Sequence, residues 1–398
     1  MALVYDLTAA QSATSRFHGG GEYAKAVLKA IIGRPDRPEF RVVYRPDHHL
    51  DPHIDRLLTE ARVERDAISG TGDLQRVLDD PATTAFYSAL PYGYGGLSFR
   101  SVQLAYTIHG LRPLECPTDS EEVLYARTPR DRVAAFLKGR LLGRYVARQR
   151  ASFEALLRSE ARSVDVFVPS EHTRFALLAA FPWVPAERVH LAYSPAKPLL
   201  EAALDPEAVR RLLAHLGVEH GRYLLMTGGE RWIKNGLRGA RALDGLYATD
   251  AEGVPPTLVL GVADPERFTR HLRRPDQFRF ADYVEAAELE ALYGAAWAFL
   301  YPTLNEGFGY PPLEAMRHGT PVVSAAVAST TELYGDAVLY VDPRSEAEIQ
   351  ARVLRLVRDM SFREALGAAG RAREVVVSGR QETMLSEMVN QLLALGRS

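Results

Sequence analysis

The chain has 398 residues, a formal net charge of −2, and 47% hydrophobic and 25% charged residues. This composition is ordinary for a folded protein, and it argues against disorder, a membrane-spanning fold and a globally basic nucleic-acid binder. Because the chain is long for a single core, we expect two domains.

Cys116 is the only cysteine, so no intramolecular disulfide and no cluster of thiolate metal ligands can form. A single cysteine is typical of a reducing compartment. Residues 1–7 are too few for a signal peptide and are interrupted by Asp6, and no apolar stretch reaches about 18 residues. We therefore expect a cytoplasmic protein.

Short β-branched or aromatic runs alternate with longer helical patterns along the whole chain. Such alternation is typical of parallel sheets covered by helices, so we predict the α/β fold class. In the first half the predicted strands are 2–7, 40–44, 84–88, 103–108, 165–169 and 189–192. In the second half they are 223–227, 257–261, 297–301, 322–324 and 338–341.

A glycine-rich stretch, 17–23, precedes a predicted helix over 23–32. Backbone N–H groups at a helix N-terminus can approach a phosphate or an acceptor. Gly19, Gly21 and Ala24 also satisfy the dinucleotide-binding pattern, although that pattern requires glycines directly after a strand and Leu7 lies well upstream. This match leaves an NAD-dependent sugar oxidoreductase as an alternative.

Three histidines, His49, His53 and His109, are candidates for metal binding or catalysis. His49 and His53 flank Asp51, but Pro52 should break any helix that would align them on a metal, so we predict no metal site there. His109 directly follows the predicted strand 103–108, at a strand's carboxyl end.

Residues 127–150 contain eight Lys or Arg and one acid, Asp131, with apolar residues spaced on one helical face. We predict a long helix whose apolar stripe packs on the sheet of the first domain. The alternative is peripheral contact with an anionic membrane surface.

The polar stretch 193–198 contains two prolines, and we place the linker between domains there. We predict a first domain over 1–195 and a second over 196–377. In the second domain, the loop 228–235 lies between a strand and a helical run over 237–246. Open α/β sheets bind ligands at the carboxyl ends of their strands, so this loop is a candidate site.

The segment 305–316 places Glu306 and Glu314 eight residues apart around a glycine-rich turn. Glycines let the backbone approach a ligand, and Pro311 and Pro312 suit the first turn of a helix whose N-terminus would face a phosphate. Because one glutamate lies on a loop and the other on a helix, we interpret them as acceptors for sugar and ribose hydroxyls rather than a paired acid and base.

The string 305–316 resembles the Glu-x7-Glu motif of glycosyltransferase family 4, whose members are retaining enzymes of GT-B architecture. The resemblance continues in both directions, from about 223 to 343. It implies two Rossmann-like domains, with the last helix, 378–398, packing back on the first.

By this resemblance Glu306 would bind the donor sugar and Glu314 the ribose, while Arg231 and Lys234 would bind the diphosphate. His109 would lie near the reacting carbon, although Gly110 replaces the aspartate that follows the family's histidine. The remaining implied donor-binding residues are Gly20, Gly21, Gly229, Gly307, Phe308, Gly309 and Tyr310. The alternative interpretation of Arg231 and Lys234 is two solvated surface cations.

The resemblance implies transfer of a mannose- or glucose-type hexose from a nucleotide diphosphate sugar to a glycan, lipid-linked or small-molecule hydroxyl. The setting would be biosynthesis of cell-surface polysaccharide or glycoconjugate, with no cofactor and no obligatory metal. The alternatives are the oxidoreductase above, a GT-B nucleotide-sugar epimerase, and an inactive nucleotide-sugar-binding subunit.

Overall fold

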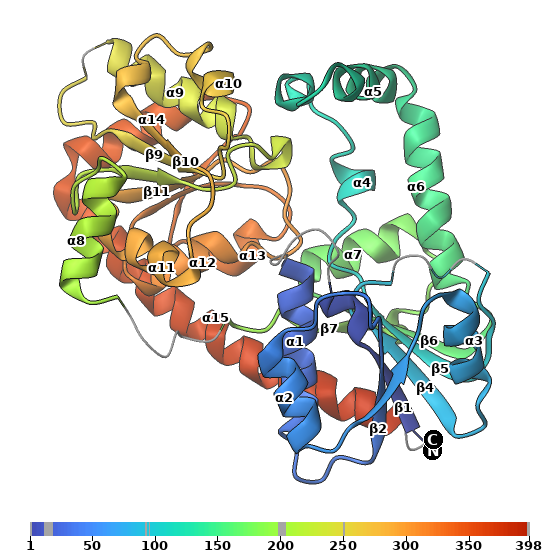
Figure 1. Ribbon diagram of the computed structural model, residues 1–398. Coiled ribbons are helices and arrows are strands. Elements are labelled where there is room, and N and C mark those ends of the chain that lie inside the picture. The colour runs from blue at the N-terminus through green and yellow to red at the C-terminus, as the bar shows by residue number, and fades with distance from the viewer. Residues whose placement is uncertain are drawn as a thin grey trace. The chain divides into compact units, whose positions relative to one another are not determined.

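The computed structural model describes residues 2–11, 19–91, 94, 96–197, 204–249 and 251–395. They form two compact units (Figure 1). The first contains Met1–Leu111, Ala147–Lys197 and Gly379–Ser398, and the second contains Arg112–Val146 and Pro198–Ser378. The sequence suggested boundaries after residues 195 and 377, and it assigned residues 112–146 to the first domain, whereas they belong to the second unit.

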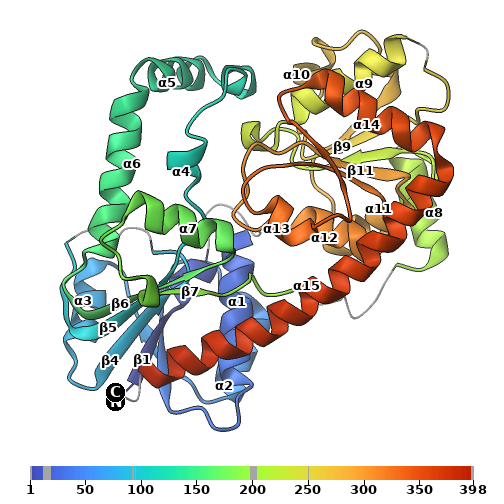
Figure 2. The same cartoon turned by 180° about the vertical axis from the view of Figure 1, so that it is seen from behind.

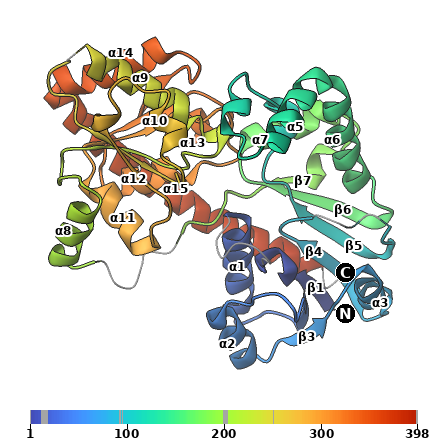
Figure 3. The same ribbon diagram turned by 45° about the horizontal axis from the view of Figure 1, so that its top comes forward.

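The described part of the first unit contains a seven-stranded parallel sheet of order β3-β2-β1-β4-β5-β6-β7 (Figure 3). The strands are β1 (Ala2–Asp6), β2 (Phe40–Tyr44), β3 (Glu64–Ala67), β4 (Thr83–Ser88), β5 (Phe99–Thr107), β6 (Ala161–Val168) and β7 (Val189–Leu191). One face packs on α1 (Gly19–Ile32), α2 (Pro52–Glu60) and the end of α15 (Met360–Leu395). The other face packs on α3 (Thr71–Asp79) and α6 (Leu142–Leu157). The remaining elements are η1 (Leu7–Ala10), α7 (Glu171–Ala180) and η3 (Ala186–Arg188).

The second unit contains a parallel sheet of order β10-β9-β8-β11-β12-β13 in its described residues. The strands are β8 (Leu224–Met226), β9 (Thr257–Leu260), β10 (Phe278–Ala281), β11 (Ala298–Tyr301), β12 (Val322–Ala325) and β13 (Leu339–Val341). Helices α9 (Gly236–Ala248) and α14 (Glu346–Arg358) cover one face, and α11 (Ala286–Ala295) and α12 (Tyr310–Arg317) cover the other (Figure 2). The remaining elements are α4 (Arg112–Glu115), η2 (Glu122–Tyr125), α5 (Pro129–Arg140), α8 (Pro206–His215), η4 (Trp232–Lys234), α10 (Glu266–Thr269), η5 (Pro275–Gln277) and α13 (Thr330–Tyr334).

The predicted α/β fold class is confirmed, and every predicted strand is present. The sequence missed two strands, β3 and β10, each at one edge of its sheet. An edge strand needs less apolar surface than a central one, and β3 (Glu-Arg-Asp-Ala) shows none of the β-branched or aromatic residues that mark the others. The predicted break near 378 is also wrong, because α15 runs unbroken through Gly379.

The basic segment 127–150 forms two helices instead of one, because α5 ends at Arg140 and α6 begins at Leu142. No residue of α5 is buried, and its apolar side chains Val133, Phe136, Leu137 and the following Leu141 are 57%, 65%, 49% and 46% exposed. The prediction that this stripe packs on the first sheet is therefore wrong. Among the described helices, none combines the length and the apolar character needed to cross a bilayer.

Candidate functional site

The strand order of the second sheet identifies where a ligand should bind. From β8 the chain moves outward to β9 and β10, and then returns to the other side of β8 with β11. Open parallel sheets bind ligands at such a switch point, beyond the carboxyl ends of the two strands. The loop after β8 carries Arg231 and Lys234, and the loop after β11 carries Glu306.

The structure brings Lys234 and Glu306 into contact at this point. The Lys234 Nζ donates to Glu306 Oε1 and, at 2.6 Å, to the Tyr301 hydroxyl. Tyr301 and Thr303 also donate to Glu306 Oε1, each at 2.7 Å. Within the described residues no hydrogen bond reaches Oε2, so one oxygen is anchored to the protein while the other keeps its acceptor capacity.

Burial alone would raise the pKa of Glu306, but the charge of Lys234 and the three hydrogen bonds outweigh it and hold the pKa below its ordinary value. Burial lowers the pKa of Lys234, the charge of Glu306 opposes that shift, and the charge of Arg231 adds to it. Arg231 is exposed and close enough to act on Lys234. This corner of the unit therefore presents one anchored carboxylate with Lys234 and Arg231 close to it.

Two contributors to this site were missed by sequence reasoning, Tyr301 and Thr303. Tyr301 ends a predicted strand and Thr303 follows Pro302, so the sequence pattern assigns both to the strand and its termination. A polar side chain at the carboxyl end of a parallel strand was a usable signal, since that is where ligands bind.

The glycines of the loop after β8 are required by packing. A Cβ on Gly229 would collide with the Val262 side chain, and Gly228 has a φ of +71°. The loop thus lies directly against the end of β9, and its backbone sets the position of Arg231.

The start of α12 is shaped as the sequence predicts. Gly309, with a φ of +95°, precedes the helix, and the helix ends before Gly319, whose φ is +75°. Because Pro311 and Pro312 have no N–H, Gly309 and Tyr310 supply the backbone donors at this end. Ser329 fixes the turn by donating to the carbonyl oxygens of Glu306 at 3.1 Å and Phe308 at 3.0 Å.

Phe308 and Glu314 are buried, with 5% and 4% of their surface exposed. Phe308 packs against Tyr310, with 5.2 Å between ring centroids. Burial raises the pKa of Tyr334 well above its ordinary value, and the charges of both Glu306 and Glu314 raise it further. The charges of both motif glutamates therefore act on the same tyrosine.

The candidates of the first unit lie at the carboxyl ends of β4 and β5. A ring nitrogen of His109, Nε2, is 2.9 Å from the Ala89 carbonyl oxygen, and the His109 ring meets Tyr23 edge-on at 4.7 Å. The predicted glycine loop over 17–23 is wrong from Gly19 onward, because α1 begins there. Gly20 and Gly21 lie in the first turn of α1, where Gly20 packs against Leu90, and residues 17 and 18 lie outside the described ranges.

This placement removes support for the dinucleotide-binding pattern. Gly21 and Ala24 are helical residues of α1 rather than parts of a strand-to-helix turn. The expectation that Pro52 breaks a helix is wrong, because Pro52 begins α2, and Asp51 caps that helix and pairs with Lys25 at 2.8 Å. No metal-ligating cluster occurs among the described residues.

Part of the second unit is similar to a known sequence family. Residues 262–373 match the family described as Glycosyl transferases group 1. The chain is 44% identical over 100 residues to O-antigen chain mannosyltransferase B of Escherichia coli, a match covering 25% of this chain and 26% of that protein. It is 38% identical over 82 residues to O-antigen chain mannosyltransferase RfbU of Salmonella typhimurium, covering 21% and 23%. The matches thus span about a quarter of these relatives.

Solved structures match the whole chain at low identity. Anabaena HepE in complex with UDP-glucose aligns with a TM-score of 0.65 and 15% identity, covering 99% of each chain. WaaG, a glycosyltransferase involved in lipopolysaccharide biosynthesis, aligns with a TM-score of 0.64 and 15% identity, covering 96% of this chain and 98% of that one. The chain therefore has the GT-B fold of two Rossmann-like domains, and residues 262–373 of its second unit are similar to the group 1 glycosyl transferases.

Proposed function

We propose that the protein is a retaining glycosyltransferase that moves a mannose- or glucose-type hexose from a nucleotide diphosphate sugar to a hydroxyl group. The acceptor is a glycan, a lipid-linked saccharide or a small molecule, in the biosynthesis of cell-surface polysaccharide or glycoconjugate. The observation that carries the proposal is the Lys234–Glu306 pair at the switch point of the second sheet, with Arg231 beside it. The mannosyltransferase relatives and the UDP-glucose complex of HepE support the donor class.

Each residue has a role in this proposal. Arg231 and Lys234 bind the diphosphate and offset the charge that builds on it as the sugar leaves. Glu306 accepts hydrogen bonds from hydroxyls of the donor sugar through Oε2, because Oε1 is held by the protein. Glu314 binds the ribose, and the backbone of Gly229, Gly307, Phe308, Gly309 and Tyr310 shapes the donor pocket. His109, Gly20 and Gly21 keep the donor-binding roles that the family resemblance implies for them.

Retention of configuration follows from attack on the same face of the sugar that the leaving diphosphate occupies. The diphosphate oxygen takes the acceptor proton as the glycosidic bond forms, so no protein nucleophile is needed. In this scheme the protein supplies positioning and charge, which is the chemistry that Arg231, Lys234 and Glu306 can perform.

A thermal-shift screen against UDP-, GDP- and ADP-sugars tests the donor class, since a ligand that binds the folded state raises its melting temperature. We expect stabilisation by one or more nucleotide sugars, and then transfer to an added saccharide acceptor with the anomeric configuration of the donor. Binding of NAD alone, or release of free nucleotide with an epimerised sugar, would refute a transferase. An inverted product would refute the retaining mechanism.

Sugar transfer is expected to survive chelation of divalent cations. Arg231 and Lys234 already provide positive charge for the diphosphate, so a metal ion is not required for that purpose. Initial rates in excess EDTA should stay within about twofold of those with Mg²⁺. A rate that collapses in EDTA and returns with Mg²⁺ or Mn²⁺ would contradict this expectation.

We also propose that α5 contacts an anionic membrane surface from one side. Val133, Phe136, Leu137 and Leu141 share one helical face and are exposed, and Arg130, Arg132, Arg140 and Arg144 are exposed around them. Exposed apolar residues rimmed by arginines match the chemistry of an anionic lipid headgroup region.

The double substitution Phe136→Ser and Leu137→Ser is expected to weaken binding to phosphatidylglycerol vesicles about tenfold in a sedimentation assay. The reason is that it removes two apolar side chains that would be buried in the lipid on binding. Binding of the parent protein should fall with added salt and be weak on phosphatidylcholine. Val375→Ser, at an exposed position of α15, is the matched control and should bind as the parent does. Equal binding by all three proteins would rule out α5 as the contact.

A further inference from the structure

A segment from the first half of the chain lies on the donor-side loops of the second unit. We call residues 112–125 the clasp; it contains α4 and η2. Cys116 of the clasp is buried against Ile233 and Leu304, the residues beside Lys234 and Thr303. Glu115 accepts a hydrogen bond of 3.2 Å from Asn305, and the Tyr125 hydroxyl accepts one of 2.8 Å from the backbone N–H of Leu237. The clasp therefore contacts both loops that carry the candidate site.

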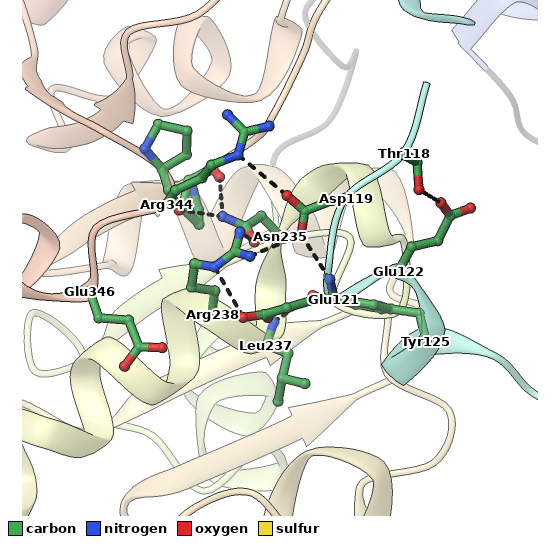
Figure 4. Close-up of polar contacts among 12 residues, drawn as sticks. Thr118, Asp119, Glu121, Glu122, Tyr125, Asn235, Leu237, Arg238, Arg344 and Glu346 are labelled. Atoms are coloured by element: carbon green, nitrogen blue, oxygen red, sulfur yellow. Dashed lines mark hydrogen bonds and ion pairs between the residues drawn. The ribbon is translucent and has the colours of Figure 1, made fainter. Parts of the chain in front are cut away.

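A buried arginine connects the clasp to the start of α9 (Figure 4). Arg238 Nη2 donates to Asp119 Oδ1 at 2.9 Å, and its Nε donates to Glu121 Oε1 at 3.1 Å. The side chains of Arg238 and Asp119 are 6% and 5% exposed. A guanidinium this deeply buried depends on nearby carboxylates, and the clasp supplies two of them.

The third nitrogen of Arg238 fixes the residue that follows Lys234. Arg238 Nη1 donates to Asn235 Oδ1 at 2.7 Å. Because a guanidinium can only donate, this bond sets the orientation of the Asn235 amide and aims its NH₂ group away from Arg238. That NH₂ group donates to the carbonyl oxygens of Pro302 at 3.0 Å and Pro343 at 2.7 Å.

Asn235 thereby joins the two loops of the candidate site. It follows Lys234 directly, and Pro302 directly precedes Thr303, which donates to Glu306. Asn235 has a φ of +59°, a left-handed conformation that asparagine adopts more readily than most residues, and its side-chain bonds help to hold this backbone in place. The orientation of Lys234 depends on this backbone.

We propose that Asp119 is a positioning residue for sugar transfer, which acts through Arg238 and Asn235 to hold Lys234 against Glu306. The proposal rests on the proposed function of the Lys234–Glu306 pair. The clasp, which precedes the linker and lies far from either loop in sequence, thus completes the donor site. In this proposal Asp119 acts through Arg238 and Asn235 rather than by direct contact with the donor.

The test measures transfer kinetics and donor affinity of Asp119→Asn. We expect kcat/KM for the nucleotide sugar to fall about tenfold or more, and binding of the free nucleoside diphosphate to weaken with it. Asp244→Asn is the matched control, because Asp244 is a buried aspartate of α9 that holds Arg273 and Arg274 instead of the donor loop. It should lose comparable melting temperature and keep kcat/KM within about twofold.

A double-mutant cycle separates positioning from a general loss of stability. In a Lys234→Ala background, Asp119→Asn should have little further effect on kcat/KM, because its target is already absent. If the fold-losses of kcat/KM from the two single substitutions multiply in the double mutant, the proposal is overturned. Asn235→Gly provides a second test if Asp119→Asn fails to fold: glycine keeps the left-handed backbone but removes the amide, and it should reproduce the loss of donor affinity.

The two proposals fail in different ways. If the parent protein neither binds nor uses any nucleotide sugar, the proposed function is wrong. If the parent transfers sugar and Asn235→Gly or folded Asp119→Asn does so equally well, the function stands and the positioning role of the clasp is wrong.

Discussion

Replacing Lys234 with methionine is expected to lower the rate of sugar transfer at least tenfold, and by about 100-fold if it acts as a single donor to developing charge. The same change should cost stability, since it leaves the Glu306 carboxylate with its counter-charge removed in a site where the Lys234 and Glu306 side chains are only 11% and 13% exposed. Removal of one partner of a buried pair typically costs about 3–5 kcal/mol. Initial rates and thermal denaturation measure the two effects separately.

The double mutant Lys234→Met, Glu306→Gln distinguishes these effects. A neutral amide in place of the Glu306 carboxylate no longer needs a counter-charge, so we expect much of the lost melting temperature to return while transfer stays at or below the level of Lys234→Met. Glu306→Ala should likewise reduce transfer at least about tenfold with the fold preserved. Near-parental transfer by either Lys234→Met or Glu306→Ala would remove the pair from the active site.

The second large effect is expected from Gly309→Ala. The φ of +95° at this residue disfavours any side chain, at a cost of about 1–3 kcal/mol, and the new Cβ would collide with the Tyr334 hydroxyl. Overpacking of this kind adds about 1–3 kcal/mol. We expect a marked fall in melting temperature and loss of nucleotide-sugar binding, because the turn that begins α12 can no longer form.

Two further variants locate the cause. Adding Tyr334→Phe removes the colliding oxygen and should recover part of the stability, but not the part due to backbone strain; it also deletes the 2.8 Å bond from Tyr334 to the Gly309 carbonyl oxygen. Gly379→Ala, where the added Cβ meets no atom within 4 Å inside α15, should instead stabilise the protein by up to about 1 kcal/mol. If Gly309→Ala behaves like Gly379→Ala, the turn does not constrain the site.

The sequence was informative where local chemistry determines structure. Gly309, Pro311 and Gly319 predict the start and end of α12 because each has a backbone preference that acts within a few residues. The contact between Lys234 and Glu306 was not predicted, because it depends on β8 and β11 being neighbours in the sheet. The roles given to His109, Arg231 and Glu314 remain predictions.

Other features depend on packing that no local pattern reveals. The low helix propensity of Gly379 favours a break there, but Val377 and Gln381 are buried on either side, and Gln381 donates to the Ser194 carbonyl oxygen at 2.6 Å. The stripe of α5 has the spacing of a core helix and yet is exposed, since spacing shows which residues share a face but not what covers it.

The clasp affects both the folding of the protein during synthesis and the fragments into which it can be cut. Asp119 precedes Arg238 by 119 residues, so at ordinary rates of synthesis its carboxylate waits about 10 s for its partner to emerge. The second unit is therefore discontinuous in sequence. A fragment limited to 198–378 would leave Arg238 without Asp119 and Glu121, its carboxylate partners from residues 112–146. A chimera designed to exchange donor specificity between relatives should therefore carry residues 112–146 along with the second unit.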